Sequence, residues 1–247
     1  MTAASIQDRY GTESEKPEDK KIVNTLWKFS PNVFSNEFVV MLPYCEYAPY
    51  DVGAATLGAL NQFKINSIYD PDLTGAGNQP LGRDTWAAMY NYYKVLETHV
   101  KYEVIEVTNN AVATTGANAY PSLHGWMCDI TATPPTSSQT WLNASNAASS
   151  NKQQKFGPIC TYDVQTGRGQ RPLHFEYHWD ASQFDTSILD NTKNEWTAVG
   201  SDPANLNYFS IMSFNPSGAI RRSVVKYEIQ FLVAFKQINR TLMNTVN

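Results

Sequence analysis

The sequence predicts an all-β fold: a single antiparallel jelly-roll sandwich of eight strands, with one or two short helices in its loops. Two observations lead to this prediction. Short runs of apolar and β-branched residues, several of them alternating with polar residues, recur along the chain. Clusters of Gly, Pro, Ser, Thr and Asn separate these runs and supply the turns. Eight such runs can be counted, which is the number of strands in a jelly roll.

The chain is expected to divide into an N-terminal arm, residues 1–30, and one jelly-roll domain, residues 31–247. The start of the arm is polar, with Lys mixed among Glu and Asp, and such a composition cannot bury a core of its own. A length of 247 residues without a low-complexity linker favours one large domain over two small ones.

The strands are expected in chain order, each bounded by turn residues. The last is the clearest, because its apolar residues occupy every second position from Val225 to Val233. Residues 134–150 and 181–203 are rich in Ser, Thr and Asn and are expected to form long loops, the first with a helical turn at 140–147. The eight expected strands are residues 37–44, 62–69, 94–108, 123–132, 155–164, 173–179, 206–214 and 224–238.

Aromatic residues are abundant and charged residues are scarce. The chain has 14 Tyr, 11 Phe and 6 Trp, whereas only 17% of its residues are charged. At least half of these rings are expected to fill the core of the sandwich. The remainder exceed what a monomer of this size needs to bury, and aromatic enrichment with depletion of charge is typical of interface cores. The composition therefore predicts extensive contact with other chains.

Three cysteines, Cys45, Cys128 and Cys160, show no spacing typical of a disulfide framework or a metal motif. Each lies in an apolar or strand-like stretch, so we expect three buried thiols and synthesis in a reducing compartment. The sequence has no apolar run of about 18 residues and no basic segment followed by an apolar one. We therefore expect neither a membrane span nor a secretory signal.

The segment from residue 69 to residue 95 is the most informative part of the chain. Asp70 precedes Pro71, which favours extended backbone at Asp70. Gly75, Gly77 and Gly82 follow, and each can adopt the positive φ that a sharp corner requires. The segment therefore predicts that one strand ends here and that the chain turns.

A short amphipathic helix is expected after this corner, with Asp84 as the residue that caps it. Large apolar residues then recur at spacings of three and four, which predicts a stripe about three turns long that packs on a sheet. These residues are Trp86, Met89, Tyr90 and Tyr93. The carboxylates of Asp70, Asp72 and Asp84 offer an alternative, a calcium site, but they lack the regular ligand spacing of such loops, and the turn-and-cap interpretation is favoured.

A family pattern runs through the same segment: a loop that ends Asn-Gln-Pro-x-Gly, then an Asp, a Trp and the run Tyr-x-x-Tyr-x-Val. This pattern resembles the capsid proteins of circovirus-like viruses, which have small circular single-stranded DNA genomes and encode a rolling-circle replication protein. The resemblance is strong over residues 69–104 and rests on strand pattern elsewhere, including the closing strand at 223–235. The expected structural corner motif consists of Asp70, Asp72, Asn78, Gln79, Pro80, Gly82, Asp84, Trp86, Tyr90 and Tyr93.

The resemblance implies a structural protein of the virion that is not an enzyme and needs no cofactor. Its partners would be other copies of itself in a closed icosahedral shell and a single-stranded DNA genome, with no membrane; a host-cell receptor is not identified by the sequence. Assembly would take place inside the host cell, in the nucleus. The chain departs from the family in one respect, because it lacks the Arg-rich N-terminal arm that binds the genome and directs nuclear import in those proteins.

The charge is distributed unevenly. The formal net charge of −4 is unfavourable for a free DNA-binding protein. From Asn205 onward, however, five basic residues face a single acid, Glu228, so this end carries +4 (five minus one). Candidate contacts to DNA are Arg221, Arg222, Lys226 and Arg240. The alternative is that the two adjacent arginines only border a turn.

One strand has a pattern suited to a metal. A period of two places His174, Glu176 and His178 on one face, a geometry that can hold a transition metal, as in a cupin-like metal-dependent enzyme. Gly-rich cupin spacing is missing, and His99 and His124 are isolated in the sequence, so a pH-sensitive interface or a solvated face is favoured. A carbohydrate-binding jelly-roll module is a further alternative. Motifs for hydrolase or phosphate chemistry do not occur.

Overall fold

A computed structural model describes residues 35–52, 58–73, 78–107, 122–133, 137, 141–143, 155–157, 160–162, 172–180, 196–214 and 221–239. Within these ranges the chain forms ten strands and one longer helix, α3 (Arg83–Met89), together with a helical turn at 141–143. The strands are β1 (Glu37–Val52), β2 (Gly58–Lys64), β3 (Tyr90–Val107), β4 (Ser122–Asp129), β5 (Lys155–Phe156), β6 (Cys160–Tyr162), β7 (Leu173–Asp180), β8 (Thr197–Ala198), β9 (Tyr208–Phe214) and β10 (Arg221–Ile238). These elements lie within the unit Glu37–Asn247. The expected arm, residues 1–30, lies outside the described ranges.

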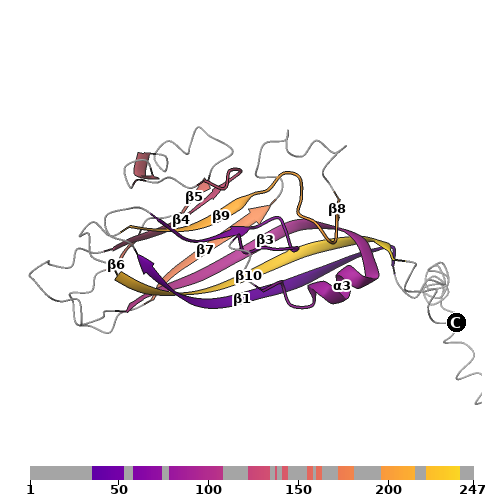
Figure 1. Ribbon diagram of the computed structural model, residues 1–247, viewed down its shortest axis with the longest axis horizontal. Coiled ribbons are helices and arrows are strands. Elements are labelled where there is room, and N and C mark those ends of the chain that lie inside the picture. The colour runs from indigo at the N-terminus through magenta and orange to yellow at the C-terminus, as the bar shows by residue number, and fades with distance from the viewer. Residues whose placement is uncertain are drawn as a thin grey trace, which may run out of the picture. The chain divides into compact units, whose positions relative to one another are not determined.

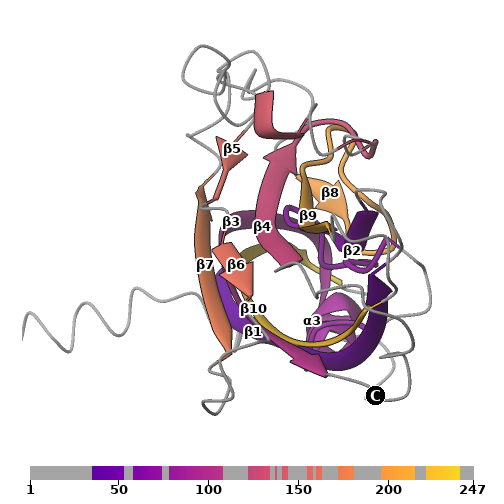
Figure 2. The ribbon, with the colours of Figure 1, turned by 90° about the vertical axis from the view of Figure 1, so that its left-hand side faces the viewer.

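The order of the strands is that of a jelly roll (Figure 1). One sheet has the order β1-β10-β3-β7, with β8 also on β3; the other has the order β2-β9-β4-β5, with β6 also on β4. The antiparallel pairs are nested along the chain: β1 with β10, β2 with β9, β3 with β7, and β4 with β5 and β6. This is the arrangement of a long hairpin rolled into two layers, which Figure 2 shows from the end. The predicted antiparallel jelly roll is therefore confirmed.

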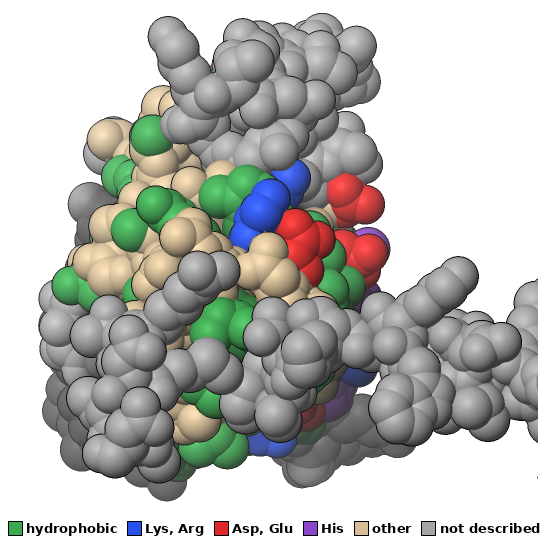
Figure 3. Space-filling model, turned by 90° about the vertical axis from the view of Figure 1, so that its right-hand side faces the viewer, with side chains coloured by type: hydrophobic (Ala, Val, Ile, Leu, Met, Phe, Trp, Pro, Cys, Tyr) green, Lys and Arg blue, Asp and Glu red, His purple; other side chains and the backbone are tan. Residues whose placement is uncertain are grey.

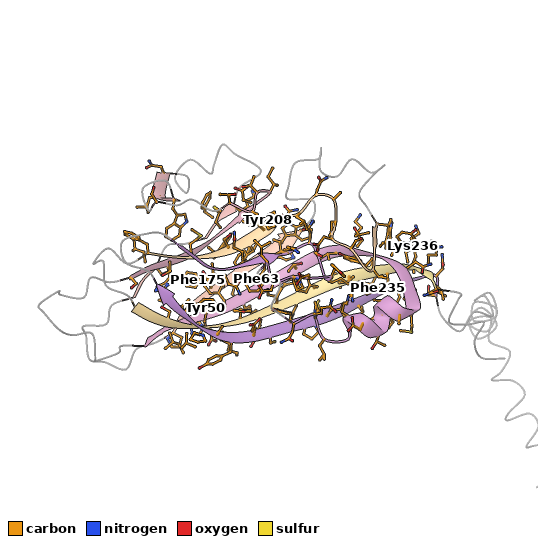
Figure 4. All side chains as sticks on the ribbon, in the orientation of Figure 1. Tyr50, Phe63, Phe175, Tyr208, Phe235 and Lys236 are labelled. Atoms are coloured by element: carbon orange, nitrogen blue, oxygen red, sulfur yellow. The ribbon has the colours of Figure 1, made fainter. Side chains whose placement is uncertain are left out.

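The two layers share one apolar core. In β10 every odd-numbered side chain from Val225 to Phe235 is completely buried, which confirms the predicted alternation. Phe63 from the opposite sheet packs edge-on against Tyr227, with 4.7 Å between ring centroids. Figure 4 places Phe63 between the two layers. Each fully buried side chain of this kind contributes about 1.5–3 kcal/mol.

The two sheets differ in how their outer faces are covered. Trp141, from the helical turn at 141–143, is completely buried and packs with Met127 and Met212 in a second, smaller cluster. The sequence predicted a helical turn at 140–147, and the described part of that segment has one. Because this cluster covers the second sheet, β4 is buried on both sides. In the first sheet, by contrast, outward-facing residues of the described strands are largely exposed.

A β-bulge in β3 keeps both halves of that strand facing the core. The register with β10 shifts here, so that Leu96 has no opposite partner. Just before the bulge the buried residues are the odd-numbered Tyr93 and Val95; after it they are even-numbered, as in Thr98 and Val100. One inserted residue exchanges the two faces of a strand, and the bulge therefore corrects a mismatch in the apolar pattern.

The corner helix is shorter than predicted and is capped differently. It ends at Met89, and the Tyr90 backbone is already extended, because Tyr90 and Tyr93 pair with Ile238 and Phe235 of β10. Cross-strand pairing thus prevails over helical spacing. The expected cap by Asp84 is wrong: Gly82, with φ of 81°, occupies the N-cap position without a side-chain cap. The left-handed φ expected of Gly82 is confirmed, whereas Gly75 and Gly77 lie outside the described residues.

Some strands also begin or end at other residues than the sequence predicted. β2 ends at Lys64, earlier than predicted, because the amide of Lys64 donates to the Pro71 carbonyl and the chain turns at once. The strand expected at 155–164 is divided into β5 and β6.

Cys45 is exposed rather than buried, since it lies on the outward side of β1, while Cys128 is buried and Cys160 half-buried. Among the described residues, no helix has both the length and the apolar character of a membrane span.

Candidate functional site: the outer face of the first sheet

An apolar row runs along the outward side of β1. It consists of Val39, Met41, Pro43, Cys45 and Tyr47. Exposed fractions are 51% for Val39, 43% for Met41 and 69% for Tyr47. Leu81, which is 76% exposed, extends the row sideways, because its amide donates to the Pro43 carbonyl over 2.9 Å. Contiguous exposed apolar side chains of this kind mark contact surfaces rather than solvated faces.

The position of the row favours contact through side chains. β1 is the last strand of its sheet, so among the described residues one of its edges has no strand beside it. Pro43 and Pro49 of this strand have no backbone N–H group to donate, which disfavours the addition of a further strand at this edge. A partner is therefore expected to pack on the apolar face instead of extending the sheet.

The neighbouring strands carry charged side chains in pairs. Lys226 Nζ lies 2.7 Å from the Glu228 carboxylate, and Lys101 Nζ lies 3.5 Å from that of Glu176. The contact between Lys226 and Glu228 raises the pKa of the lysine and lowers the pKa of the glutamate. The hydrogen bond is the larger cause of both shifts, and the attraction between the charges is the second. The end of the molecule that faces the viewer in Figure 3 also carries Lys and Arg side chains beside Asp and Glu. Exposed pairs such as these contribute little to stability, but they neutralise the surface.

The predicted DNA contacts are only partly described. Arg221 and Arg222 begin β10, where their backbones are opposite Val52 and Asp51 of β1, but the structure describes no side-chain position for them. Lys226 is exposed and pairs with Glu228. Arg240 lies outside the described residues. Only Lys226 can therefore be placed, on the same outward side of the sheet as Glu228.

The predicted corner motif is held together by a residue that the sequence analysis did not single out, Arg83. Its guanidinium is buried, donates to the Val199 carbonyl and to Gln79 Oε1, and lies 5.2 Å from the centre of the Tyr69 ring. Gln79 in turn donates to the Tyr69 carbonyl. An Arg among Gly, Pro and Asn residues of a tight corner was the available signal, because such a side chain can satisfy several carbonyl oxygens at once.

The remaining corner residues have structural roles or stay unassigned. Asp72 is buried and bridges to Phe63, whereas the Asp70 carboxylate is 3.9 Å from Lys64 Nζ. Asp84 pairs with Arg83 at 2.7 Å. Within the described ranges these three aspartates do not gather into a ligand set, so the calcium alternative finds no support. Asn78 and Pro80 lie in the loop before α3, and Trp86 on α3 stacks on Phe38 at 4.6 Å.

The histidine row is divided among separate partners on β3. His174 Nδ1 lies 3.3 Å from Glu103, and Glu176 pairs with Lys101. His178 lies instead beside His99, its partner in the register, with the ring centroids 4.2 Å apart. His99, isolated in the sequence, is thus not isolated in the structure. The predicted set of His174, Glu176 and His178 is not brought together as a metal site among the described residues.

No protein-family model and no curated protein matches this sequence. Among solved structures, the chain is similar to that of Cocksfoot mottle virus, with 14% identity, a TM-score of 0.40 and coverage of 84% of this chain and 99% of that one. It is also similar to the BFDV capsid protein, solved as a 60-mer, with 14% identity, a TM-score of 0.37 and coverage of 83% and 96%. For Mud crab tombus-like virus the identity is 9%, the TM-score 0.38 and the coverage 87% and 90%. The jelly-roll assignment rests on the strand order and register of this chain.

Proposed function

We propose that this protein is a viral coat protein whose copies assemble into a small icosahedral shell. The observation that supports the proposal best is the apolar row on the outer face of β1. Jelly rolls serve many functions, so the fold by itself does not select one. A subunit that presents exposed Val39, Met41 and Tyr47 in one line gains free energy by burying them against an identical neighbour.

The composition adds independent support. Many aromatic residues of the described part of the chain are buried, yet Tyr47, Tyr69 and Tyr92 remain substantially exposed, at 69%, 37% and 38%. Tyr combines a large rigid apolar ring with a polar end, which suits a surface that becomes buried only on assembly. Repetition of one modest contact around closed symmetry axes then makes a stable particle.

The test is assembly of the purified protein, followed by sedimentation velocity and negative-stain electron microscopy. Wild-type protein is expected to form closed particles. The double variant Val39→Lys, Tyr47→Lys is expected to stay monomeric with an unchanged circular dichroism spectrum, because burial of two ammonium groups opposes association. Leu142→Lys, at a 37% exposed position away from the row, is the matched control and should assemble. Monomeric wild-type protein would contradict the coat-protein proposal, whereas normal assembly of the double variant would exclude the row as a contact.

We further propose that the shell encloses single-stranded DNA, with Arg221, Arg222, Lys226 and Arg240 as phosphate contacts. The proposal is supported by the excess of four positive charges from Asn205 to the end of the sequence. Lys226 is the weakest member of this set, because Glu228 already neutralises it. The arginine pair at the start of β10 is therefore the place to test.

Replacement of Arg221 and Arg222 by Gln should flatten the dependence of oligonucleotide affinity on salt. Each lost phosphate contact to a single strand removes about 0.7 from the slope of log affinity against log salt concentration, so the double variant should lose about 1.4. Lys236→Gln is the control, since Lys236 pairs with Glu37 and lies 5.0 Å from the centre of the Trp196 ring. An unchanged slope in the double variant would remove these arginines from the DNA contact.

A further inference from the structure

A cluster of three potential ligands lies on the outer face of the first sheet, where β3 meets β7. Glu97 and His99 are two residues apart on β3 and so share a face, and His178 is directly opposite His99 in the register. The Glu97 carboxylate lies 3.2 Å from His178 Nε2 and 3.6 Å from His99 Nε2. Among the described residues this is the group of His, Cys, Asp and Glu side chains whose ligand atoms lie within 4.8 Å of one another.

These distances match those between neighbouring ligand atoms around a bound metal ion. With metal–ligand bonds of about 2.1 Å, two ligand atoms in a tetrahedral shell lie about 3.4 Å apart. The distances from the Glu97 oxygen to the two histidine nitrogens, 3.2 and 3.6 Å, lie on either side of that value. A single ion placed between the three side chains would thus need little movement of the carboxylate.

The types of ligand indicate which ion fits. Two imidazole nitrogens and one carboxylate oxygen suit zinc and other late divalent transition metals, whereas magnesium and calcium prefer oxygen alone. The three side chains remain 38–45% exposed, which leaves room for water in the other coordination positions. The site is therefore open and exchangeable, unlike a closed structural zinc site.

The backbone holds these ligands in place before any ion binds. All three belong to one antiparallel strand pair, which fixes the distance between opposite side chains. The stacked imidazole rings, tilted by only 18°, already lie side by side. We propose that Glu97, His99 and His178 form a binding site for a divalent transition-metal ion, with zinc as the preferred ion, and that the ion ties β7 to β3.

An ion bound at this site is expected to stabilise the folded protein. β7 is the end strand of its sheet, and its described neighbours in that sheet lie on the β3 side alone. An ion bound by ligands from both strands binds the folded state and not the unfolded one, so it raises the unfolding temperature, and the increase grows with the concentration of free ion relative to its dissociation constant. This effect is separate from self-assembly and does not depend on the proposed function.

The experiment measures Zn²⁺ binding by calorimetry and Co²⁺ binding by its visible absorption, near neutral pH, on the full-length protein. Wild-type protein is expected to bind one Zn²⁺ per chain at this site and to melt at a higher temperature with the ion, whereas Mg²⁺ should have no effect. His99→Gln and His178→Gln should each weaken binding by at least about tenfold, since even outer-shell partners change metal affinity by about 10- to 100-fold.

His174→Gln is the matched control. His174 is an exposed histidine on the same strand, and it also lies near a glutamate of β3, Glu103, at 3.3 Å, but it has no second histidine opposite. This variant should retain wild-type Zn²⁺ affinity. Absence of zinc binding by the wild-type protein would overturn the proposal, as would equal loss of affinity in His174→Gln and His178→Gln. Normal circular dichroism of all three variants, expected at such exposed positions, excludes misfolding as the cause.

Discussion

At the scale of single residues, the least obvious structural role belongs to Arg83. A guanidinium with only 9% of its side chain exposed is costly to bury unless its donors are used. Here it joins α3 to the Val199 carbonyl and to the Gln79 side chain, so the corner loop and the segment before β9 are fixed to each other. The residue thus sets how the chain passes from the corner into β3.

Replacement of Arg83 by Met should lower the free energy of unfolding by about 2–4 kcal/mol, because the half-buried Val199 carbonyl loses its charged donor. Urea unfolding followed by circular dichroism measures the change. Asp84→Asn serves as the control: the Asp84 side chain is 80% exposed, and its loss of charge should change stability by no more than about 0.5 kcal/mol. Equal stability of Arg83→Met and wild type would show that the buried contacts of Arg83 contribute nothing.

Gly157 is required for a different reason, which is space. A Cβ atom at this position would overlap the indole ring of Trp126. The ring cannot easily move, since it packs on Tyr177 at 4.3 Å and on Phe209 at 5.5 Å. The Gly157 amide also donates to the Trp126 carbonyl, which fixes the approach of the two backbones.

Gly157→Ala is therefore expected to cost about 1–3 kcal/mol of unfolding free energy, the usual penalty for overpacking. Gly200→Ala is the control, because a Cβ there meets no atom within 4 Å, and it should be neutral or slightly stabilising. Thermal and urea unfolding of both variants measure the difference. Identical midpoints for the two variants would mean that the Trp126 ring can move aside without loss of stability.

At the scale of elements, the short helix α3 depends on its sheet. Seven residues are too few for a helix to be stable alone, so its order comes from packing. Trp86 supplies most of that packing through Phe38, Phe235 and Tyr90. Because Trp86 is only partly buried, its removal opens a smaller cavity than loss of a core tryptophan would.

Trp86→Ala should destabilise the protein by about 2–3 kcal/mol, below the 3–5 kcal/mol typical of a fully buried ring. Leu81→Ala, at a 76% exposed position just before the helix, should leave the unfolding midpoint unchanged. Denaturant unfolding of the two variants under conditions that keep the protein monomeric provides the comparison. A Trp86→Ala protein as stable as wild type would show that α3 does not depend on this stack.

At the scale of the whole molecule, buried tyrosines connect the layers of the sandwich. Asn61 of β2 donates to the hydroxyls of Tyr50 and Tyr227, so polar ends meet between the two sheets. Tyr93 OH donates to the Ser201 carbonyl and lies 3.0 Å from Ser67 Oγ. Burial raises the pKa of Tyr93 from its ordinary value of 10 to about 12 and raises the pKa of Tyr227 as well.

These shifts predict alkaline unfolding. A tyrosine whose pKa is higher in the folded state stabilises the fold below pH 10, and that contribution is lost as the pH rises from about 10 to about 12. For Tyr93 alone the loss is about 2–3 kcal/mol. Urea unfolding at a series of pH values, with tyrosinate absorbance recorded in parallel, tests the expectation. Tyr93→Phe should be less sensitive to alkaline pH than wild type; an unfolding free energy that is constant from pH 9 to 12 would contradict it.

Much of the fold follows from local pattern. The alternation in β10, the shared face of His174, Glu176 and His178 on β7 and the turn at Gly82 all depend on neighbours in the sequence, and each was predicted correctly because a strand or turn imposes its period on adjacent residues. The candidate site followed only in part. The aromatic surplus predicted a contact surface, but the apolar row on β1 emerged only when the structure placed that strand at the end of a sheet.

The sequence by itself thus determined the fold class, the approximate positions of the strands and the presence of surplus aromatic surface, because these depend on composition and short-range periodicity. Only the tertiary structure decided that Tyr90 and Tyr93 belong to a strand, that Leu96 forms a bulge and that Arg83 is buried. It also brought His99 next to His178, 79 positions further along the chain. Each of these outcomes depends on pairing between distant segments, and the free energy of that pairing cannot be predicted from the local pattern of either segment alone.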